Sequence, residues 1–321
     1  NILRDIPLTA AYKLLITIAD FLEDIFWNST QNQTASHSTT SEEGFEVDQW
    51  DDEMILNKYA EAIRGRQYLP ESSDGSGNFK IYKITEKVVI KQTGARTFRS
   101  NGSVPHEALA IEFVRKHTSI PVPRVIRTIH SAKMPGRHLY VMETIPGKQL
   151  GQVWPTLSLW HKLRVAWTLR SYIRQLRRAE STLSYVPGPL GPKPQMCVGF
   201  IFEGKRRTAF PDLQSISDWF RAHVQDRRAC NHLPPSTYDP FKSCTRMVLT
   251  HMDLNMRNIL MGKDGRISIV DWDWSGFYPE WFEYTSMFYA EFINGPLSWM
   301  RCIPFITNPY VDNVRWLGGG L

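Results

Sequence analysis

Apolar positions in the first half of the chain follow the spacing of β-strands. The β-branched runs at residues 79–84 and 87–91 lie on either side of a two-residue turn, which predicts a β-hairpin. Two more apolar runs, at 125–130 and 138–143, predict further strands. Between the hairpin and these strands, apolar residues recur at helical spacing from about 105 to 117. One helix is therefore expected inside a strand-rich region.

Beyond about residue 147 the apolar spacing becomes mainly helical. In residues 157–183 apolar side chains recur every three or four positions, which predicts one long helix, and a shorter helix is expected at 216–224. Two short strands, at 258–261 and 267–270, flank a turn that contains glycine. A small β-rich part followed by a larger α-rich part predicts an α+β fold.

The N-terminal region precedes this pattern. Residues 10–27 read as an amphipathic helix, and the polar, Ser/Thr-rich residues 28–46 read as a flexible linker. A helix is then expected from about 50 to 65, with Asp48 as its N-cap and Gly65 as its stop signal.

The charge balance favours anionic ligands without indicating nucleic acid. The formal net charge is +6 and the pI is near 9.1, but the basic residues are too dispersed for a nucleic-acid surface. The densest basic run, RQLRR at 174–178, has helical spacing, which favours a solvated helix face over a binding patch.

Cysteine usage and hydropathy bear on the compartment. The four cysteines show no CxxC spacing, so free thiols are expected and a reducing, cytoplasmic location fits. No run of 18 apolar residues occurs, so no transmembrane span is predicted. The oligomeric state leaves no signal in the sequence.

The chemistry is concentrated in residues 249–273, LTHMDLNMRNILMGKDGRISIVDWD. Asn258 follows Asp253 by five positions, and Asp271 comes directly after an apolar strand. Phosphoryl transfer requires hard oxygen ligands for Mg²⁺, which Asp271 and Asn258 can supply, and a carboxylate to accept the proton of the attacking hydroxyl, which Asp253 can supply. Each residue alone is typical of a turn. Together with His251 they predict a phosphotransferase site.

The first half supplies matching candidates for nucleotide binding. Lys91 ends the strand VVIK, and Glu107 opens the following helix as its expected ion-pair partner. The loop at 72–78, SSDGSGN, which includes Ser76 and Gly77, could fold over phosphates through its backbone N–H groups. An ordinary turn remains an equally good interpretation of that loop.

These motifs resemble the fungal branch of the aminoglycoside phosphotransferase and choline-kinase-like family. The likeness covers residues from about 50 to 290, and LTHMDLNMRNIL and IVDWDWSGFYPEW are its most specific motifs. It implies a bilobal protein-kinase-like fold that uses ATP and Mg²⁺ to phosphorylate a hydroxyl of a small molecule. Relatives usually continue beyond the equivalent of residue 321. The predicted organisation is a helix and linker (1–46), an N-lobe (47–143) and a C-lobe (144–321), for which truncation is one interpretation.

The resemblance also assigns roles to residues. It implies that Asp253 is the catalytic base, that Asn258 and Asp271 bind magnesium, and that Lys91 and Glu107 clamp the phosphates. The adenine would be held by backbone groups around Met142, Glu143 and Ile145.

The segment after Asp271 suggests an acceptor site. Aromatic and acidic residues alternate there, and such a cluster can hold an ammonium group. An amine-bearing acceptor is therefore one hypothesis, and core packing of the aromatic residues is the other. The candidate acceptor-binding residues are Trp272, Asp273, Glu280 and Glu283.

Two other functions compete with a small-molecule kinase. A protein kinase needs a long peptide-docking segment after its metal-binding Asp, but Pro279–Glu280 follows Asp271 by only eight positions. A non-catalytic pseudokinase or scaffold would bind nucleotide without turnover.

Overall fold

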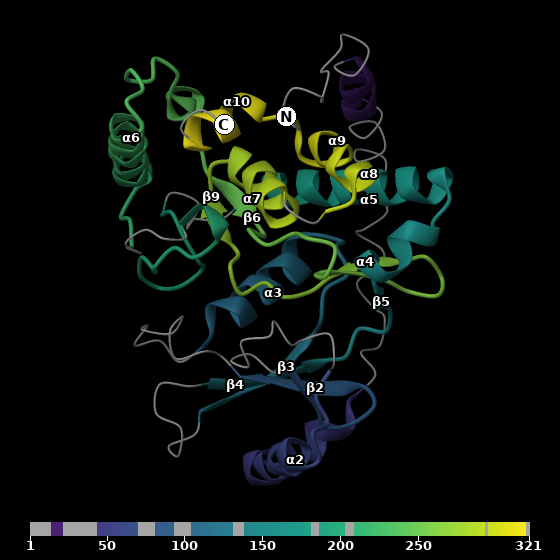
Figure 1. Cartoon of the computed structure of the whole chain (residues 1–321). Helices are drawn as coiled ribbons and strands as arrows, with labels where there is room; N and C mark the ends of the chain where they lie inside the picture. Colours follow the sequence, from purple (N-terminus) through teal and green to yellow (C-terminus); the bar gives the residue numbers. More distant parts are fainter. Residues whose placement is uncertain are drawn as a thin grey trace.

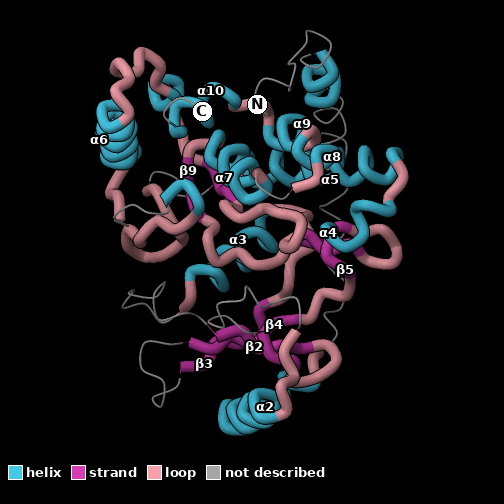
Figure 2. The backbone as a smooth tube through the Cα atoms, in the orientation of Figure 1, coloured by secondary structure: helices cyan, strands magenta, loops and turns pink. Residues whose placement is uncertain are grey.

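A computed structural model describes residues 14–21, 44–69, 81–92, 104–130, 138–180, 186–202, 209–292 and 295–318 of the chain. A small sheet with flanking helices forms one end of the molecule, and a larger helical part forms the other (Figure 1). This arrangement confirms the predicted α+β fold. Strands occupy little of the helical part, where loops and helices dominate the backbone (Figure 2).

Four antiparallel strands build the sheet in the order β1-β2-β4-β3. Alternation along β2 and β4 gives the sheet two different faces, because successive side chains in a strand point to opposite sides. One face carries Ile90 and Val141, which pack in an apolar cluster. Lys91 and Tyr140 are register partners on the other face. The strands are β1 (Ile81–Lys83), β2 (Val88–Gln92), β3 (Val125–His130) and β4 (His138–Glu143).

Helix α2 (Asp52–Arg64) covers the apolar face of this sheet through Ile55 and Tyr59. Its N-cap is Asp51, whose carboxylate accepts the Met54 N–H at 2.7 Å. The predicted cap, Asp48, is therefore wrong. Asp48 lies instead in the short 3₁₀ helix η1 (Glu46–Gln49), where it accepts the Phe45 N–H at 2.7 Å. The helix ends at Gly65, as predicted.

Helix α3 (His106–His117) connects the sheet to the helical part. Its first turn places Glu107 against the face of the sheet that carries Lys91 and Tyr140. Ala110, Ile111 and Val114 of the same helix belong to the large core of the helical part. The predicted helix at 105–117 is confirmed almost to the residue.

The helical part is organised around α5 (Leu159–Arg178) and α7 (Trp281–Glu291). Their apolar faces meet in one core that also takes in the short strands. The predicted long helix ends earlier than expected, and α6 extends beyond the predicted 216–224 segment at both ends, starting after its N-cap Asp212. The other helices are α4 (Leu150–Val153), α6 (Leu213–Cys230), α8 (Leu297–Met300), α9 (Ile303–Thr307) and α10 (Val311–Gly318), with 3₁₀ helices η3 (Trp154–Thr156), η4 (Phe200–Phe202) and η5 (Pro240–Ser243).

Two small sheets hold the loops that carry the candidate site. Strands β5 (Lys148–Gln149), β7 (Ile259–Met261) and β8 (Ile267–Ile269) form one sheet, and β6 (Val248–Thr250) pairs with β9 (Gly276–Tyr278) in the other. The predicted strands at 258–261 and 267–270 are confirmed, whereas β5, β6 and β9 were not predicted.

Residues 14–21 are helical and lie against α5, with Ile16 and Ala19 buried. Most of the predicted linker lies outside the described residues. Among the helices of the described ranges, none is both long and apolar enough to cross a membrane.

Gly276 in β9 lies in close contact with the backbone of Gly188. A Cβ atom there would lie 2.3 Å from the carbonyl oxygen of Gly188, and the N–H and C=O groups of Gly188 pair with Phe277. We expect Gly276→Ala to lower the free energy of unfolding by about 1–3 kcal/mol or more, because backbone must move to admit the methyl group. Denaturant unfolding measures the change.

Gly151→Ala is the matched control. Gly151 lies in α4, and the nearest atom to an added Cβ is 3.6 Å away. Alanine in a helix is more stable than glycine by roughly 0.5–1 kcal/mol, so this variant should be neutral or stabilised. Equal destabilisation of both variants would refute the argument from backbone contact.

Candidate active site

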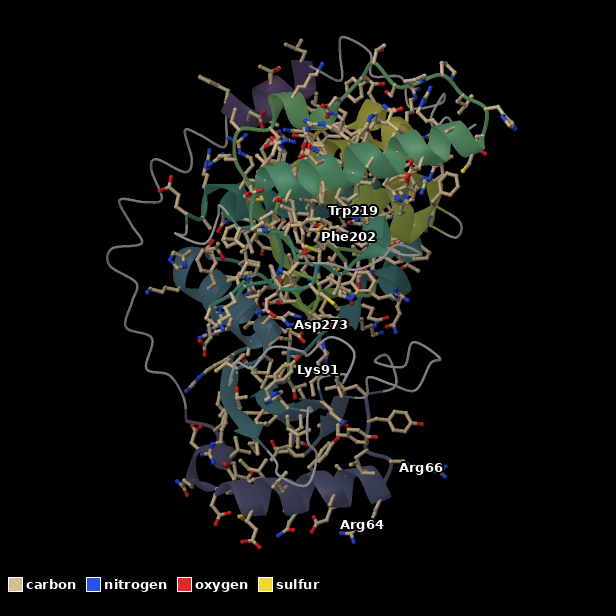
Figure 3. All side chains as sticks on the ribbon, turned by 90° about the vertical axis from the view of Figure 1, so that its left-hand side faces the viewer. Arg64, Arg66, Lys91, Phe202, Trp219 and Asp273 are labelled. Carbon is tan, nitrogen blue, oxygen red and sulfur yellow. The ribbon has the colours of Figure 1, made fainter. Side chains whose placement is uncertain are left out.

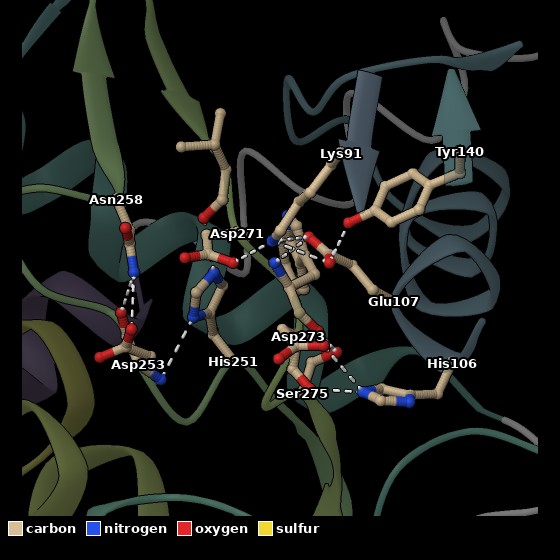
Figure 4. Close-up of polar contacts among 12 residues, drawn as sticks. Lys91, His106, Glu107, Tyr140, His251, Asp253, Asn258, Asp271, Asp273 and Ser275 are labelled. Atoms are coloured by element: carbon tan, nitrogen blue, oxygen red, sulfur yellow. Dashed lines mark hydrogen bonds and ion pairs between the residues drawn. The ribbon is translucent and has the colours of Figure 1, made fainter. Parts of the chain in front are cut away.

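The loop at residues 251–258 connects β6 to β7 and carries Asp253 and Asn258 (Figure 4). Asn258 donates from its amide nitrogen to the Asp253 Oδ2 atom at 2.9 Å and to the Asp253 carbonyl at 2.9 Å. Asn255 donates to Asp253 Oδ1 at 2.8 Å. Two amides thus fix the carboxylate of Asp253. Asn255 was missed from the sequence, although a polar residue two positions after an aspartate is typical of such loops.

The Asp253 carboxyl group is suited to accept a proton. Burial, together with the nearby Asp271 carboxylate, raises its pKa to about 7. A carboxylate with a pKa near neutrality is a stronger base than an ordinary one, and a general base works best when its pKa lies near the working pH.

His251 supports the loop from inside. Its Nε2 atom lies 3.1 Å from the Val270 carbonyl, and its Nδ1 atom lies 3.3 Å from the backbone N–H of Asp253. Burial lowers the pKa of His251 to about 4, so the ring is neutral, with Nε2 as donor and Nδ1 as acceptor. This tautomer ties Val270, the residue after β8, to the backbone of Asp253.

Glu283 of α7 anchors the start of the same loop. Its Oε2 atom accepts the backbone N–H of His251 at 2.5 Å, and its side chain is fully buried. Burial raises the pKa of this carboxyl to about 7. Glu283 therefore positions the loop from the core.

Asp271 follows β8 in a left-handed backbone conformation, with φ of 65°. Its carboxylate is 42% exposed and lies 2.5 Å from the Lys91 Nζ atom. The backbone hydrogen bond from Val270 to the Asn258 carbonyl, at 3.0 Å, sets Asn258 beside the residue that precedes Asp271. The loop after β8 and the loop before β7 therefore meet.

These residues fit a magnesium ion. The hydrogen bonds of the Asn258 side chain use its amide nitrogen, so its oxygen is left as a ligand, and Asp271 presents a partly exposed carboxylate. No cluster of three or more His, Cys, Asp or Glu suited to a metal occurs in the described ranges. One carboxylate and one amide suit Mg²⁺, which keeps several waters and binds substrate phosphates.

Lys91 lies between the sheet and the helical part, where it contacts Glu107 and Asp271. Its Nζ atom lies 2.9 Å from both carboxylate oxygens of Glu107 and also contacts Asp271 (Figure 4). Burial opposes the charged form, yet the Asp271 and Glu107 carboxylates keep the pKa of Lys91 well above its usual value. The ammonium group is therefore charged and placed beside the exposed carboxylate of Asp271.

Glu107 accepts hydrogen bonds from two further donors besides Lys91. The Tyr140 hydroxyl donates to its Oε2 atom, and the backbone N–H of Trp272 donates to Oε1 at 3.1 Å. Burial raises the pKa of Glu107 to about 7, against the attraction of Lys91. Tyr140 was missed from the sequence because only the pairing of β2 with β4 places it opposite Lys91.

A second ion pair lies beside the first. His106 Nε2 lies 2.6 Å from the Asp273 carbonyl and 3.2 Å from its Oδ1 atom. Burial opposes both charges, but the hydrogen bond between the partners raises the pKa of His106 and lowers the pKa of Asp273. Asp273 therefore ties the segment after β8 to α3, a role that sequence reasoning did not foresee.

The acceptor hypothesis is contradicted for two of its four residues. Trp272 and Glu283 are 0% and 1% exposed, so neither reaches a surface at which an acceptor could bind. Asp273, whose side chain is 16% exposed, pairs with His106, and the exposed Glu280 accepts the Tyr310 hydroxyl at 2.5 Å, so acceptor binding by these two residues stays a prediction. The neighbouring aromatic residues pack in the core, because helix α7 is apolar around its first turns. Core packing explains most of the aromatic residues of the cluster.

Of the remaining candidates for nucleotide binding, three lie in the described residues and two lie outside them. Met142 and Glu143 end β4 at the junction of the two parts, and Ile145 follows in the connecting segment. The side chain of Glu143 accepts the backbone N–H of Arg124 at 3.2 Å, which fixes the end of the strand. Ser76 and Gly77 lie outside the described residues.

Comparison with solved structures finds aminoglycoside phosphotransferases. One is aminoglycoside phosphotransferase APH(4)-Ia, with 12% identity, 82% of this chain and 96% of that chain covered, and a TM-score of 0.45. Another is APH(2")-IIa in a complex with gentamicin, with 14% identity, coverage of 83% and 84%, and a TM-score of 0.49. No curated protein matches the sequence.

The family assignment rests on a match over most of the chain. Residues 73–301 match the phosphotransferase enzyme family, a span that includes Lys91, Glu107, the 251–258 loop and Asp271. The family predicted from the sequence motifs is confirmed, and its fungal branch stays a prediction. The chain belongs to the phosphotransferase enzyme family.

Proposed function

We propose that the protein uses ATP and Mg²⁺ to phosphorylate a hydroxyl group of a small molecule. The observation that carries the proposal is the convergence of Asp253, Asn258, Asp271 and Lys91, which come from both parts of the fold. In the chain these residues are separated by up to 180 positions, yet Lys91 contacts Asp271 directly.

Each residue has a role that its contacts support. Asp253, whose carboxylate is fixed by two amides, orients the acceptor hydroxyl and takes its proton. The hydroxyl oxygen forms a bond to the γ-phosphorus, the bond to the β,γ-bridging oxygen breaks, and ADP leaves. Lys91, oriented by Glu107, binds phosphate oxygens. Asn258 and Asp271 hold Mg²⁺, which neutralises phosphate charge when bound.

The proposal assigns no acceptor contact to the buried Trp272 and Glu283, and an amine-bearing acceptor stays a prediction. The proposal disfavours a peptide acceptor. From Asp271 the described chain passes through a short turn into β9 and then α7, so these residues contain no long docking segment.

The first test replaces the base. Asp253→Asn should lower kcat by about 10²–10⁴ and leave the Kd for ATP nearly unchanged, because the carboxylate acts on the acceptor and not on the nucleotide. Coupled ADP release measures kcat, and calorimetry measures Kd.

Asp226→Asn is the control for this test. Asp226 is exposed on α6, and the substitution removes the same charge. A kcat above a tenth of the wild-type value in Asp253→Asn would refute the base. Nucleotide binding without turnover by the wild-type protein, across a broad set of hydroxyl acceptors, would instead indicate a pseudokinase.

The second test concerns the metal. Asp271→Ala should weaken Mg²⁺-dependent ATP binding more than Asn258→Ala does, because a charged carboxylate binds the hard cation more strongly than a neutral amide. Calorimetric titrations with Mg²⁺ and with EDTA isolate the metal-dependent part, which is taken for each variant as the difference between its own two titrations. The opposite order of losses would contradict the assignment of ligands.

A further inference from the structure

Helix α7 supports the 251–258 loop at a second point besides Glu283. Glu291 is the last residue of α7, and its Oε1 atom accepts the backbone N–H of Met256 at 3.2 Å. Glu283 and Glu291 are 291 − 283 = 8 residues apart, which corresponds to roughly 12 Å along the helix axis at about 1.5 Å per residue. One helix therefore holds the loop near its start and near its end.

Residues 255–258 form a β-turn within this loop. The Asn258 N–H donates to the Asn255 carbonyl at 3.1 Å, so Met256 and Arg257 are the central residues of the turn. The closing hydrogen bond uses neither of the two central N–H groups. The Asn255 Oδ1 atom accepts the N–H of Arg257 at 2.9 Å, and Glu291 accepts that of Met256. Glu291 thus completes the hydrogen bonding of the turn.

Met256 is buried, so its N–H group depends on this contact. Its side chain is 6% exposed and belongs to the large core of the helical part, and its carbonyl accepts the N–H of Gly151 at 3.2 Å. A backbone N–H that is buried without a partner is unfavourable, because it has lost its hydrogen bond to water. Without the Glu291 carboxylate the turn would have to move to find another acceptor.

The Glu291 side chain is itself confined. The Gly295 N–H donates to the Glu291 carbonyl at 2.7 Å, and a Cβ atom at Gly295 would lie 3.0 Å from the Glu291 Oε2 atom. Burial raises the pKa of Glu291, against the hydrogen bond from Met256 and the nearby charge of Arg257. The chain after α7 therefore folds back over the carboxylate and limits the positions that it can take.

The turn carries groups on both sides of the proposed reaction. The Asn255 amide donates to Asp253 Oδ1 at 2.8 Å and so fixes the proposed base. Asn258, two residues after Met256, donates to Asp253 Oδ2 at 2.9 Å and is the proposed amide ligand of Mg²⁺. A shift of the Met256 backbone would displace both asparagines.

We propose that Glu291 is a positioning residue, which holds the 255–258 turn through the Met256 N–H so that Asn255 orients the base and Asn258 presents its oxygen to the metal. The inference rests on the proposed function for the roles of Asp253 and Asn258. Glu291 acts through the turn, and a misplacement of reacting groups by about 1 Å can cost roughly 10²-fold in rate.

The test compares Glu291→Gln with Glu291→Met. Glutamine keeps an oxygen that can accept the Met256 N–H but loses the charge, whereas methionine has a similar length and no such acceptor. Hydrogen exchange resolved by NMR on the full chain should show the Met256 amide exchanging about 10-fold faster in Glu291→Met, and close to the wild-type rate in Glu291→Gln. The His251 amide, which Glu283 binds, should stay protected in both variants.

ATP titrations give a second readout, which a merely structural role would not produce. For each variant the metal-dependent part is the difference between its own titrations with Mg²⁺ and with EDTA. This part should fall about 10-fold in Glu291→Met, because Asn258 is displaced, while the Kd for ATP in EDTA stays at the wild-type value. Glu291→Gln should restore most of the metal-dependent part. An equal loss in both titrations would show general destabilisation and would overturn the proposal.

Glu53→Met is the matched control. Glu53 is exposed on α2, the helix that ends at Arg64 at the far end of the molecule (Figure 3), and its replacement removes the same charge. Both readouts should equal those of the wild type. Thermal unfolding checks that each variant folds, and Glu291→Ala, which also lacks the acceptor, takes the place of Glu291→Met if that variant does not.

Two further outcomes would overturn the positioning role. One is unchanged exchange of the Met256 amide in Glu291→Met, and the other is an equal loss in Glu291→Gln and Glu291→Met, which would assign the effect to the charge that faces Arg257. An absence of Mg²⁺-dependent ATP binding by the wild-type protein would instead contradict the proposed function, and the amide exchange would still decide whether Glu291 holds the turn.

Discussion

The buried carboxylate of Glu107 is the interaction on which the two parts of the fold depend. It comes from α3, yet it receives Lys91 and Tyr140 from the sheet and the backbone N–H of Trp272 from the helical part. An ionised carboxylate in the interior is costly unless hydrogen bonds and a countercharge compensate it. Here every donor that compensates Glu107 also fixes the position of a segment near the proposed site. The contacts that compensate the charge of Glu107 are therefore the same contacts that bring the segments of the proposed site together.

A second buried carboxylate, Glu283, does the same for the 251–258 loop. It binds the backbone of His251, and His251 in turn joins the Val270 carbonyl to the backbone of Asp253. Rigid support of this kind holds reacting groups in position before the substrate arrives, which reduces the reorganisation needed in the transition state. It also explains why acidic residues next to the site can be wholly inaccessible to ligands.

The arginine-lined cavity at the C-terminal half of α5 is also held together by long-range contacts. Arg170 and Arg177 donate to backbone carbonyl groups, and Arg170 and Arg174 share the carboxylate of Asp20. The N-terminal helical residues supply an internal carboxylate to this cavity through Asp20. A segment with no place in the phosphotransferase motifs thus gains a defined contact with the family fold.

The sequence alone determined the features that depend on local spacing. The strands at 125–130 and 138–143, the helix ending at Gly65 and the α3 helix were predicted because side-chain periodicity and end signals are local properties. The five-residue spacing of Asp253 and Asn258 identified the loop for the same reason. The three-residue strands β6 and β9 escaped prediction because they are too short and too evenly buried to alternate.

Tertiary structure decided which polar residues meet and which are buried. No local pattern states that Tyr140 faces Glu107, that Asp273 pairs with His106, or that Asp20 reaches Arg170. For the same reason Glu283, which the sequence suggested as an acceptor ligand, proved to be an internal anchor. Burial and long-range pairing depend on how distant segments pack, and a carboxylate has the same appearance in a sequence whether it faces water, a lysine or a backbone N–H.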